Sequence, residues 1–185
     1  MAQVAGIQGN ELYVNQIMEK IRKDIDDALS ALQDIFDRVN PKQVNVIPFE
    51  GSWTAAQLAQ HLIMANGGFA GLLYGPADET NRPVDQLVAR IKEDFENFDI
   101  RMEAPSFIKP ALKDYDKQEL SNKLNQIRLD INKAVEELDL TKTITGWELP
   151  VYGHLTRLEA VYFVFYHTRR HTRQLTNIHN KLINQ

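Results

Sequence analysis

The sequence predicts an all-α fold, a helical bundle built from four long helices. Apolar residues recur at steps of three and four, the period of an amphipathic helix, over the ranges 11–38, 54–74, 117–138 and 156–182. No segment shows a convincing strand pattern. Apolar stripes without strands favour packing of helix on helix around one core. The length of 185 residues fits a single domain, which we assign to 1–185.

The first helix is predicted from Glu11 to about Arg38, after a loose lead-in over 1–10. Its apolar residues form one stripe, and acidic and basic residues fill the opposite face. The helix should end at Asn40, because a residue that precedes proline is pushed out of the helical region.

The second helix is predicted after a connector over 41–53. Thr54 and Gln57 have the spacing of a capping box, in which each side chain accepts a hydrogen bond from the backbone of the other residue. The helix should continue until just before Pro76, and His61 lies beside its apolar stripe.

The connection over 76–115 is the least regular part of the chain. Its apolar spacing predicts one extra short helix over 83–98. Pro105 and Pro110 then bracket a segment that should be extended or turned. A connection of this length argues against a simple up-down-up-down bundle with tight turns.

The third helix and the last helix both begin with capping-box spacing. Asp116 and Glu119 mark the start of the third helix, and Thr156 and Glu159 mark the start of the last. Within the last helix, the segment 160–166 is apolar on all sides, which indicates that neighbouring elements cover most of it.

The composition excludes several classes of protein. A net charge of −4 does not suggest the basic surface that holds a phosphate backbone, so we expect no nucleic-acid partner. Without cysteine, the chain has no disulfide, no thiolate ligand and no cysteine nucleophile. The longest apolar run is too short to cross a bilayer, and the first residues lack the pattern of a signal peptide. We therefore expect a cytoplasmic protein with no membrane partner.

Two of the five histidines, His167 and His171, lie four residues apart in the last predicted helix. At about 100° per residue they stand on one face of that helix, which Gln174 shares and Arg170 flanks. Two imidazoles at this spacing can reach one metal ion, and His61 on the second helix would supply a third ligand. Three neutral ligands leave a coordination position open, as in catalytic metal sites.

The same histidines are also explained without a metal. Histidine pairs at this spacing are frequent by chance, so His167 and His171 can be solvated residues and His61 a hydrogen-bonded core residue. On spacing alone, this second interpretation is the better supported. His154 lies about 20 Å of helix rise from His167, and His179 is rotated by about 80° from His171, so we expect both to be structural or surface residues.

Three further polar residues are candidates for the surroundings of a metal site. Gln174 lies one turn from His171 and is placed to orient it through a hydrogen bond. Gln57 and Arg170 are candidate pocket residues, although any exposed helix carries side chains of these types.

Two parts of the sequence resemble the DinB/YfiT-like family. The segment 52–62, SWTAAQLAQHL, is similar to the family's second helix, where a tryptophan and a small hydroxyl residue precede a histidine ligand. The segments 153–159 and 166–174, GHLTRLE and YHTRRHTRQ, are similar to the family's last helix, with its H-x-x-x-H pattern and trailing glutamine. The two parts stand in the family's order and about a hundred residues apart.

The resemblance implies an up-down-down-up four-helix bundle with an extra short helix between helices 2 and 3. It implies a divalent metal site of His61, His167 and His171, for which nickel or zinc is the usual ion in the family, and it suggests a homodimer. One departure is visible, since relatives often carry His-Pro where this chain has Leu149-Pro150. That departure leaves the three histidine ligands intact, but the entrance to the site can differ in shape from that of relatives.

The resemblance also implies a function. Characterised members of the family include transferases in which a low-molecular-weight thiol, such as bacillithiol, mycothiol or glutathione, attacks an electrophile. Because this chain has no cysteine, any thiolate must come from such a cosubstrate. We therefore predict a metal-dependent transferase acting on a small-molecule electrophile. Two alternatives stay open: a metal-assisted hydrolase of amides or esters, and a non-catalytic helical bundle that acts as a binding or stress-response protein.

Overall fold

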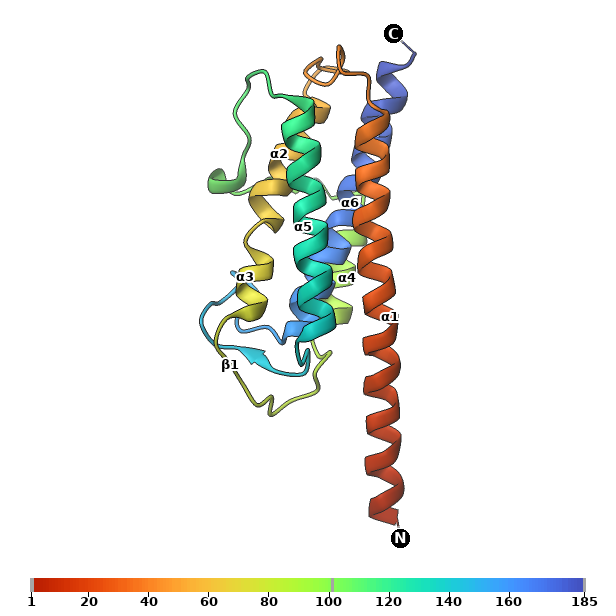
Figure 1. The fold of residues 1–185 in the computed structure, drawn as a ribbon, viewed down its shortest axis with the longest axis vertical. Helices are drawn as coiled ribbons and strands as arrows, with labels where there is room; N and C mark the ends of the chain where they lie inside the picture. Colours follow the sequence, from red (N-terminus) through yellow and green to blue (C-terminus); the bar gives the residue numbers. More distant parts are fainter. Residues whose placement is uncertain (1, 101, 185) are drawn as a thin grey trace.

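Helices form most of the structure, a computed structural model that describes residues 2–100 and 102–184, with side chains from residue 12 onward. Four helices lie side by side along one axis (Figure 1). Their bounds are Ala2–Arg38 for α1, Ala55–Asn66 for α2, Lys117–Glu137 for α5 and Arg157–Leu182 for α6. The predicted all-α class is confirmed.

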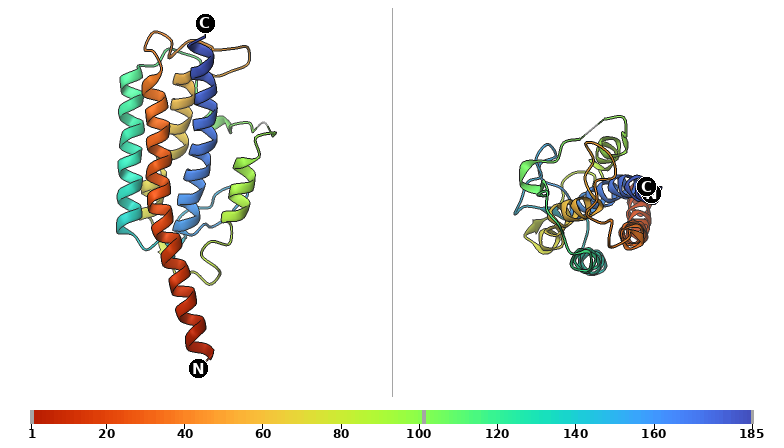
Figure 2. Two further views of the ribbon diagram at one scale, coloured as in Figure 1. Left: turned by 90° about the vertical axis from the view of Figure 1, so that its right-hand side faces the viewer. Right: turned by 90° about the horizontal axis from the view of Figure 1, so that it is seen from above.

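The four helices pack as a ring in which each helix contacts two others. α1 contacts α5 and α6, and α2 also contacts α5 and α6. In Figure 1, α1 and α6 run upward, whereas α2 and α5 run downward. The view from above in Figure 2 shows the same helices around a shared centre. α2 and α6 are therefore neighbours, which the predicted histidine site requires.

The start of α1 differs from the prediction. The helix begins at Ala2, so the segment expected to be a loose lead-in over 1–10 is helical throughout its described part, and Met1 lies outside the described residues. No proline interrupts this segment, and the helix that begins at Ala2 continues unbroken into the predicted one.

The second helix is shorter than predicted. α2 ends at Asn66, and the chain continues as α3 (Phe69–Tyr74) after two glycines. A Cβ added at Gly67 would lie 2.6 Å from the Ile63 carbonyl oxygen, so this close turn requires glycine. Phe69 at the start of α3 is buried, so the apolar stripe continues across the break. The periodicity alone therefore could not reveal where α2 ends.

The connection between α3 and α5 contains the predicted short helix and two small elements. α4 (Val88–Glu96) lies within the predicted range and packs against α6. Figure 2 shows α4 standing outside the four-helix ring. The segment between the prolines forms one 3₁₀ turn, η1 (Ser106–Ile108).

A two-stranded antiparallel sheet, which was not predicted, ties two connections together. β1 (Ala77–Asp78) pairs with β2 (Thr143–Ile144), and Ala77 is opposite Ile144. Each strand has two residues, too few for an alternation of apolar and polar residues to be visible in the sequence.

The predicted caps form at three helix starts. The Thr54–Gln57 and Thr156–Glu159 capping boxes are complete, with both reciprocal hydrogen bonds. At α5 the Asp116 carboxylate accepts a hydrogen bond from the Glu119 backbone N–H at 2.7 Å. These caps satisfy helix N–H groups that have no partner within their own helix.

Glu159 has a second role beyond its cap. Its carboxylate is fully buried and accepts hydrogen bonds from both Arg82 guanidinium nitrogens at 2.6 Å. It also accepts from the backbone N–H groups of Leu87 at 2.8 Å and Thr156 at 2.9 Å. A buried carboxylate is tolerated when it is paired in this way. Glu159 thereby anchors the segment before α4 to the start of α6.

The apolar core divides into two clusters along the bundle. On α6 the first cluster ends at Tyr166 and the second includes Leu175. The residues between them on α6 include His167 and His171. The histidines therefore lie where the apolar core is interrupted, and a polar site there displaces no packed apolar side chain.

Candidate metal centre

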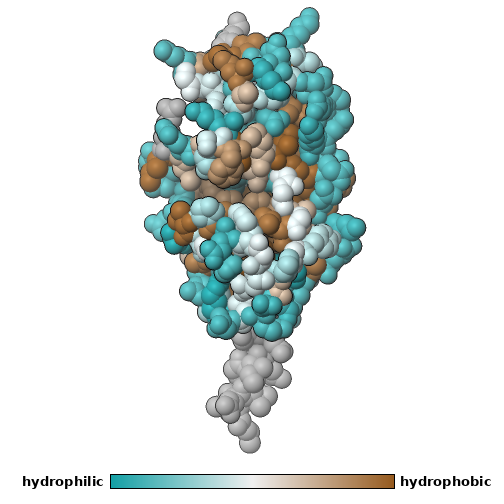
Figure 3. Space-filling view, turned by 90° about the vertical axis from the view of Figure 1, so that its left-hand side faces the viewer, coloured by the Kyte–Doolittle hydropathy of each residue, from teal (hydrophilic) through white to brown (hydrophobic). Residues whose placement is uncertain are grey.

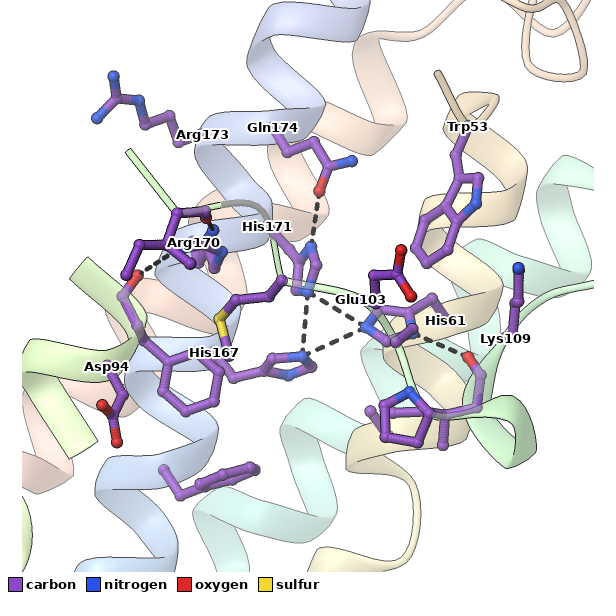
Figure 4. A pocket seen from close by; sticks show the side chains of 18 of the residues that line it. Trp53, His61, Asp94, Glu103, Lys109, His167, Arg170, His171, Arg173 and Gln174 are labelled. Carbon is purple, nitrogen blue, oxygen red and sulfur yellow. Dashed lines mark hydrogen bonds between the residues drawn. The ribbon is translucent and has the colours of Figure 1, made fainter. Parts of the chain in front are cut away.

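Three histidine side chains converge between α2 and α6 (Figure 4). The Nε2 atom of His61 lies 3.3 Å from that of His167 and 3.2 Å from that of His171. The Nε2 atoms of His167 and His171 are 3.0 Å apart. The four-residue spacing on α6 places two of these rings on one face, and the adjacent α2 supplies the third.

Each histidine uses its other ring nitrogen to contact an oxygen that accepts a hydrogen bond. His61 Nδ1 lies 2.9 Å from the Ile108 carbonyl oxygen, and His171 Nδ1 lies 3.0 Å from the Gln174 side-chain oxygen. His167 Nδ1 lies 3.1 Å from the Asn66 side-chain oxygen. A carbonyl oxygen can only accept, so each Nδ1 must carry the proton and donate it.

This pattern determines which atoms face the centre. With the protons on Nδ1, all three Nε2 atoms present lone pairs to one another. Three lone pairs at this separation repel unless a cation lies among them. Outer hydrogen bonds to oxygen are also the arrangement that orients histidine ligands around a metal.

The separations themselves fit a metal ion. Metal–nitrogen bonds of about 2.0–2.1 Å place neighbouring ligand nitrogens about 3.0 Å apart in an octahedral site and about 3.3 Å apart in a tetrahedral one. The observed distances of 3.0, 3.2 and 3.3 Å lie in this range. The donor set is therefore compatible with a divalent metal and does not discriminate between the two geometries.

The surroundings keep the histidines neutral. His61 and His167 are buried and His171 is partly buried. Burial lowers the pKa of His61, and it lowers the pKa of His167 well below the usual value, with help from the neighbouring His171. Burial and the nearby His61 lower the pKa of His171 to about 3. Neutral imidazoles bind metal, so these shifts favour the ligand form.

A large open groove leads to the histidines. It has a volume of about 2080 Å³, and all three histidines line it. Figure 3 shows apolar surface spread over the middle of one face of the molecule. Exposed apolar side chains also line the groove. Met64 lies on α2, and the others come from the connectors between helices: Phe49, Phe98, Ile100, Met102, Phe107 and Val151.

The other predicted pocket residues have different roles. Gln174 hydrogen-bonds to His171 as the spacing suggested. Gln57 is buried in the cap of α2, and its amide donates to the Ala111 carbonyl at 3.4 Å, so it holds the connector before α5. Arg170 lines the groove but donates to backbone carbonyls at the end of α4 and beyond, including that of Phe95 at 3.0 Å.

The two remaining histidines lie outside the cluster. His154 is exposed, contacts the Trp147 carbonyl at 3.1 Å and pairs with Glu148. His179 is partly buried on the last turns of α6. Neither belongs to the group of His61, His167 and His171.

Sequence reasoning missed Asn66 and the Ile108 carbonyl. Asn66 is the last residue of α2 and is buried, and a buried asparagine signals a specific hydrogen-bond role. The Ile108 contribution is a backbone atom, which no side-chain pattern can reveal.

Among the described residues, no helix is both long and apolar enough to cross a membrane.

Comparison with known proteins found one family. The family profile of the DinB superfamily matches residues 24–175, a range that contains all three histidines. No curated protein and no solved structure matched the chain.

Proposed function

Because the chain belongs to the DinB superfamily and brings three histidines together, we propose that it is a metal-dependent enzyme. In this proposal His61, His167 and His171 hold one divalent ion, either nickel or zinc. The reaction is the transfer of a low-molecular-weight thiol to an electrophilic small molecule.

One observation carries the proposal. All three Nε2 atoms face one point while each Nδ1 is bound to an oxygen, so the protein presents three neutral donors in the form a metal needs. In a histidine cluster that served only packing, each unprotonated Nε2 would accept a hydrogen bond from a donor. Here the three Nε2 atoms have one another as neighbours.

A bound divalent ion supplies Lewis acidity, which lowers the pKa of a thiol and yields thiolate at neutral pH. The protein's own residues place the reactants. The histidines leave the groove side of the centre open, and Asn66, Gln174 and the Ile108 carbonyl hold the imidazole rings in position.

The transfer is balanced without a further reagent. The thiol gives its proton to solvent, the sulfur forms a bond to the electrophilic carbon, and the leaving group departs with the electron pair of its bond. Two features support a thiol from outside the chain. The sequence has no cysteine, and the groove of about 2080 Å³ exceeds the about 300–1,000 Å³ of a pocket for one small molecule.

The first test is the metal content of protein purified without a histidine tag. We expect about one equivalent in the wild type and none in His61→Ala or His171→Ala. His179→Ala is the matched control, because it removes a histidine from the same helix outside the cluster. Equal metal content in His171→Ala and the wild type would refute the site.

The second test follows consumption of an electrophile by the metal-loaded protein. Turnover that requires an added thiol supports the transfer. Turnover of an ester or amide without thiol would replace the proposal with a hydrolase. Absence of metal from the wild type, with no change of melting temperature on addition of zinc or nickel, would favour a non-catalytic binding protein.

A further inference from the structure

The middle of α6 is buried except at one residue, Phe163. Every other residue from Leu158 to Thr168 is buried, whereas Phe163 is only partly buried and lines the groove. It precedes His167 by four residues, so its ring lies next to the histidine centre on the same face of the helix. A phenyl ring is therefore partly exposed in the groove beside the candidate metal centre.

Phe163 belongs to a cluster of packed aromatic rings. Its ring is stacked on that of Phe69, with centroids 5.5 Å apart and an interplanar angle of 12°. It is also stacked on the His167 imidazole, at 6.0 Å and 20°. Phe163 is thus stacked both on Phe69 and on the ring of a candidate metal ligand, His167.

Other aromatic rings contact this cluster at steep angles. Phe95 and Tyr152 each form an edge-to-face pair with Phe163, with centroid distances of 5.0 and 6.0 Å. Trp147 stands at 78° to Phe69, with centroids 6.2 Å apart. All of these rings line the groove, and three of them, Trp147, Tyr152 and Phe163, are partly exposed.

The loop that carries Trp147 and Tyr152 has a strained backbone. Val151 adopts a φ of 77°, which is rare for a β-branched residue. The Tyr152 N–H donates to the Leu149 carbonyl at 3.1 Å, so Val151 is the third residue of a turn that normally places glycine or asparagine there. Strained residues of this kind gather at ligand sites, and Val151 lines the groove.

From these observations we propose that the groove contains a subsite for a planar aromatic group. The partly exposed rings of Phe163, Trp147 and Tyr152 line it, and the buried Phe69 packs against Phe163. This inference rests on the proposed function for its chemistry. It adds the substrate class, because the electrophile would then carry an aromatic ring system. A flat ring would make offset-stacked or edge-to-face contacts with these side chains, the arrangements that aromatic pairs prefer.

Binding can be measured separately from the metal and from turnover. Isothermal titration calorimetry on the metal-free protein would compare 2-naphthol with decahydro-2-naphthol, its saturated counterpart, which has the same carbon skeleton and hydroxyl group. Neither alcohol is an electrophile. We expect 2-naphthol to bind about tenfold more tightly, because it gains several ring contacts that the saturated compound cannot make.

Variants locate the binding. Phe163→Leu keeps an apolar side chain and should weaken 2-naphthol binding about 2- to 12-fold, with little effect on the saturated alcohol. Phe107→Leu is the matched control, since Phe107 lines the same groove outside the aromatic cluster, and it should bind as the wild type does. Trp147→Leu, in a loop outside the bundle, provides a second measurement if Phe163→Leu folds poorly.

Equal affinity for the two alcohols would overturn the subsite. So would unchanged 2-naphthol binding in both Phe163→Leu and Trp147→Leu. Loss of metal from His171→Ala leaves this titration unaffected, so the subsite and the metal-dependent reaction are tested independently.

Discussion

Asn66 offers a direct test of how the outer hydrogen bonds support metal binding. Its side-chain oxygen accepts from His167 Nδ1 at 3.1 Å, and its side-chain nitrogen donates to Thr168 at 3.3 Å. Asn66→Ala removes both contacts from a buried position. Asn66→Asp keeps an oxygen facing His167 and loses only the donor to Thr168.

The expected loss follows from the contact. Removing the oxygen partner of a histidine ligand typically costs about 10- to 100-fold in metal affinity, or about 1.4–2.7 kcal/mol. We place Asn66→Ala in this range, because its buried position gives water little access to replace the lost acceptor. Asn66→Asp should bind at least as tightly as the wild type, since a carboxylate makes His167 a more basic ligand.

The assay is competition with a chelator of known affinity near neutral pH. Gln174→Ala is a graded control, because Gln174 is exposed and water can replace its hydrogen bond to His171, so its loss should be below about tenfold. Asn66→Ala with wild-type affinity would refute the reasoning. So would an Asn66→Asp protein as weak as Asn66→Ala, because the acceptor would then be irrelevant.

Further predictions concern stability. Val151→Gly relieves the positive φ of 77° and should stabilise the protein by about 1 kcal/mol, raising the melting temperature by about 2–4 °C; an unchanged or lower value would contradict the strain. Glu159→Gln leaves Arg82 without its buried carboxylate and should cost about 3 kcal/mol in urea unfolding, whereas a loss below about 1 kcal/mol would show that the pair is dispensable. In the metal-free protein the pKa of His171 is about 3, below the ordinary value of about 6.5, so the unfolded chain binds more protons between these values. Stability should therefore fall by about 1.4 kcal/mol per pH unit for this histidine as the pH drops below 6.5, and urea unfolding of His171→Gln should show a shallower pH dependence.

The helices were predictable because their signals are local. The capping residues at Thr54 and Thr156 marked the starts of α2 and α6 to within a residue, since a cap depends on four consecutive residues. The end of α2 was not predictable, because the apolar stripe continues past Gly67 into α3. The β1–β2 pair joins two segments far apart in the sequence, and such contacts leave no local pattern.

The candidate centre was predictable in part for the same reason. His167 and His171 share a face by helix geometry alone, whereas the position of His61 depended on the expected packing of the bundle and on the family resemblance. The oxygen partners of the histidine Nδ1 atoms were likewise predictable only where they lie close in the sequence. Gln174 follows from its place one turn after His171, but the Ile108 carbonyl reaches His61 only because a long connection folds back over the bundle.

The histidines and part of the groove lining come from different kinds of structure. All three imidazoles project from α2 and α6, whereas Val151, Trp147 and Phe107 stand on the segments that join the helices. The contribution of Ile108 to the centre is a backbone carbonyl, which any residue at that position retains. Substitutions in the connectors can therefore change which molecules bind in the groove while the histidine centre stays intact. The same bundle can thus be adapted to different substrates without a change in its reaction chemistry.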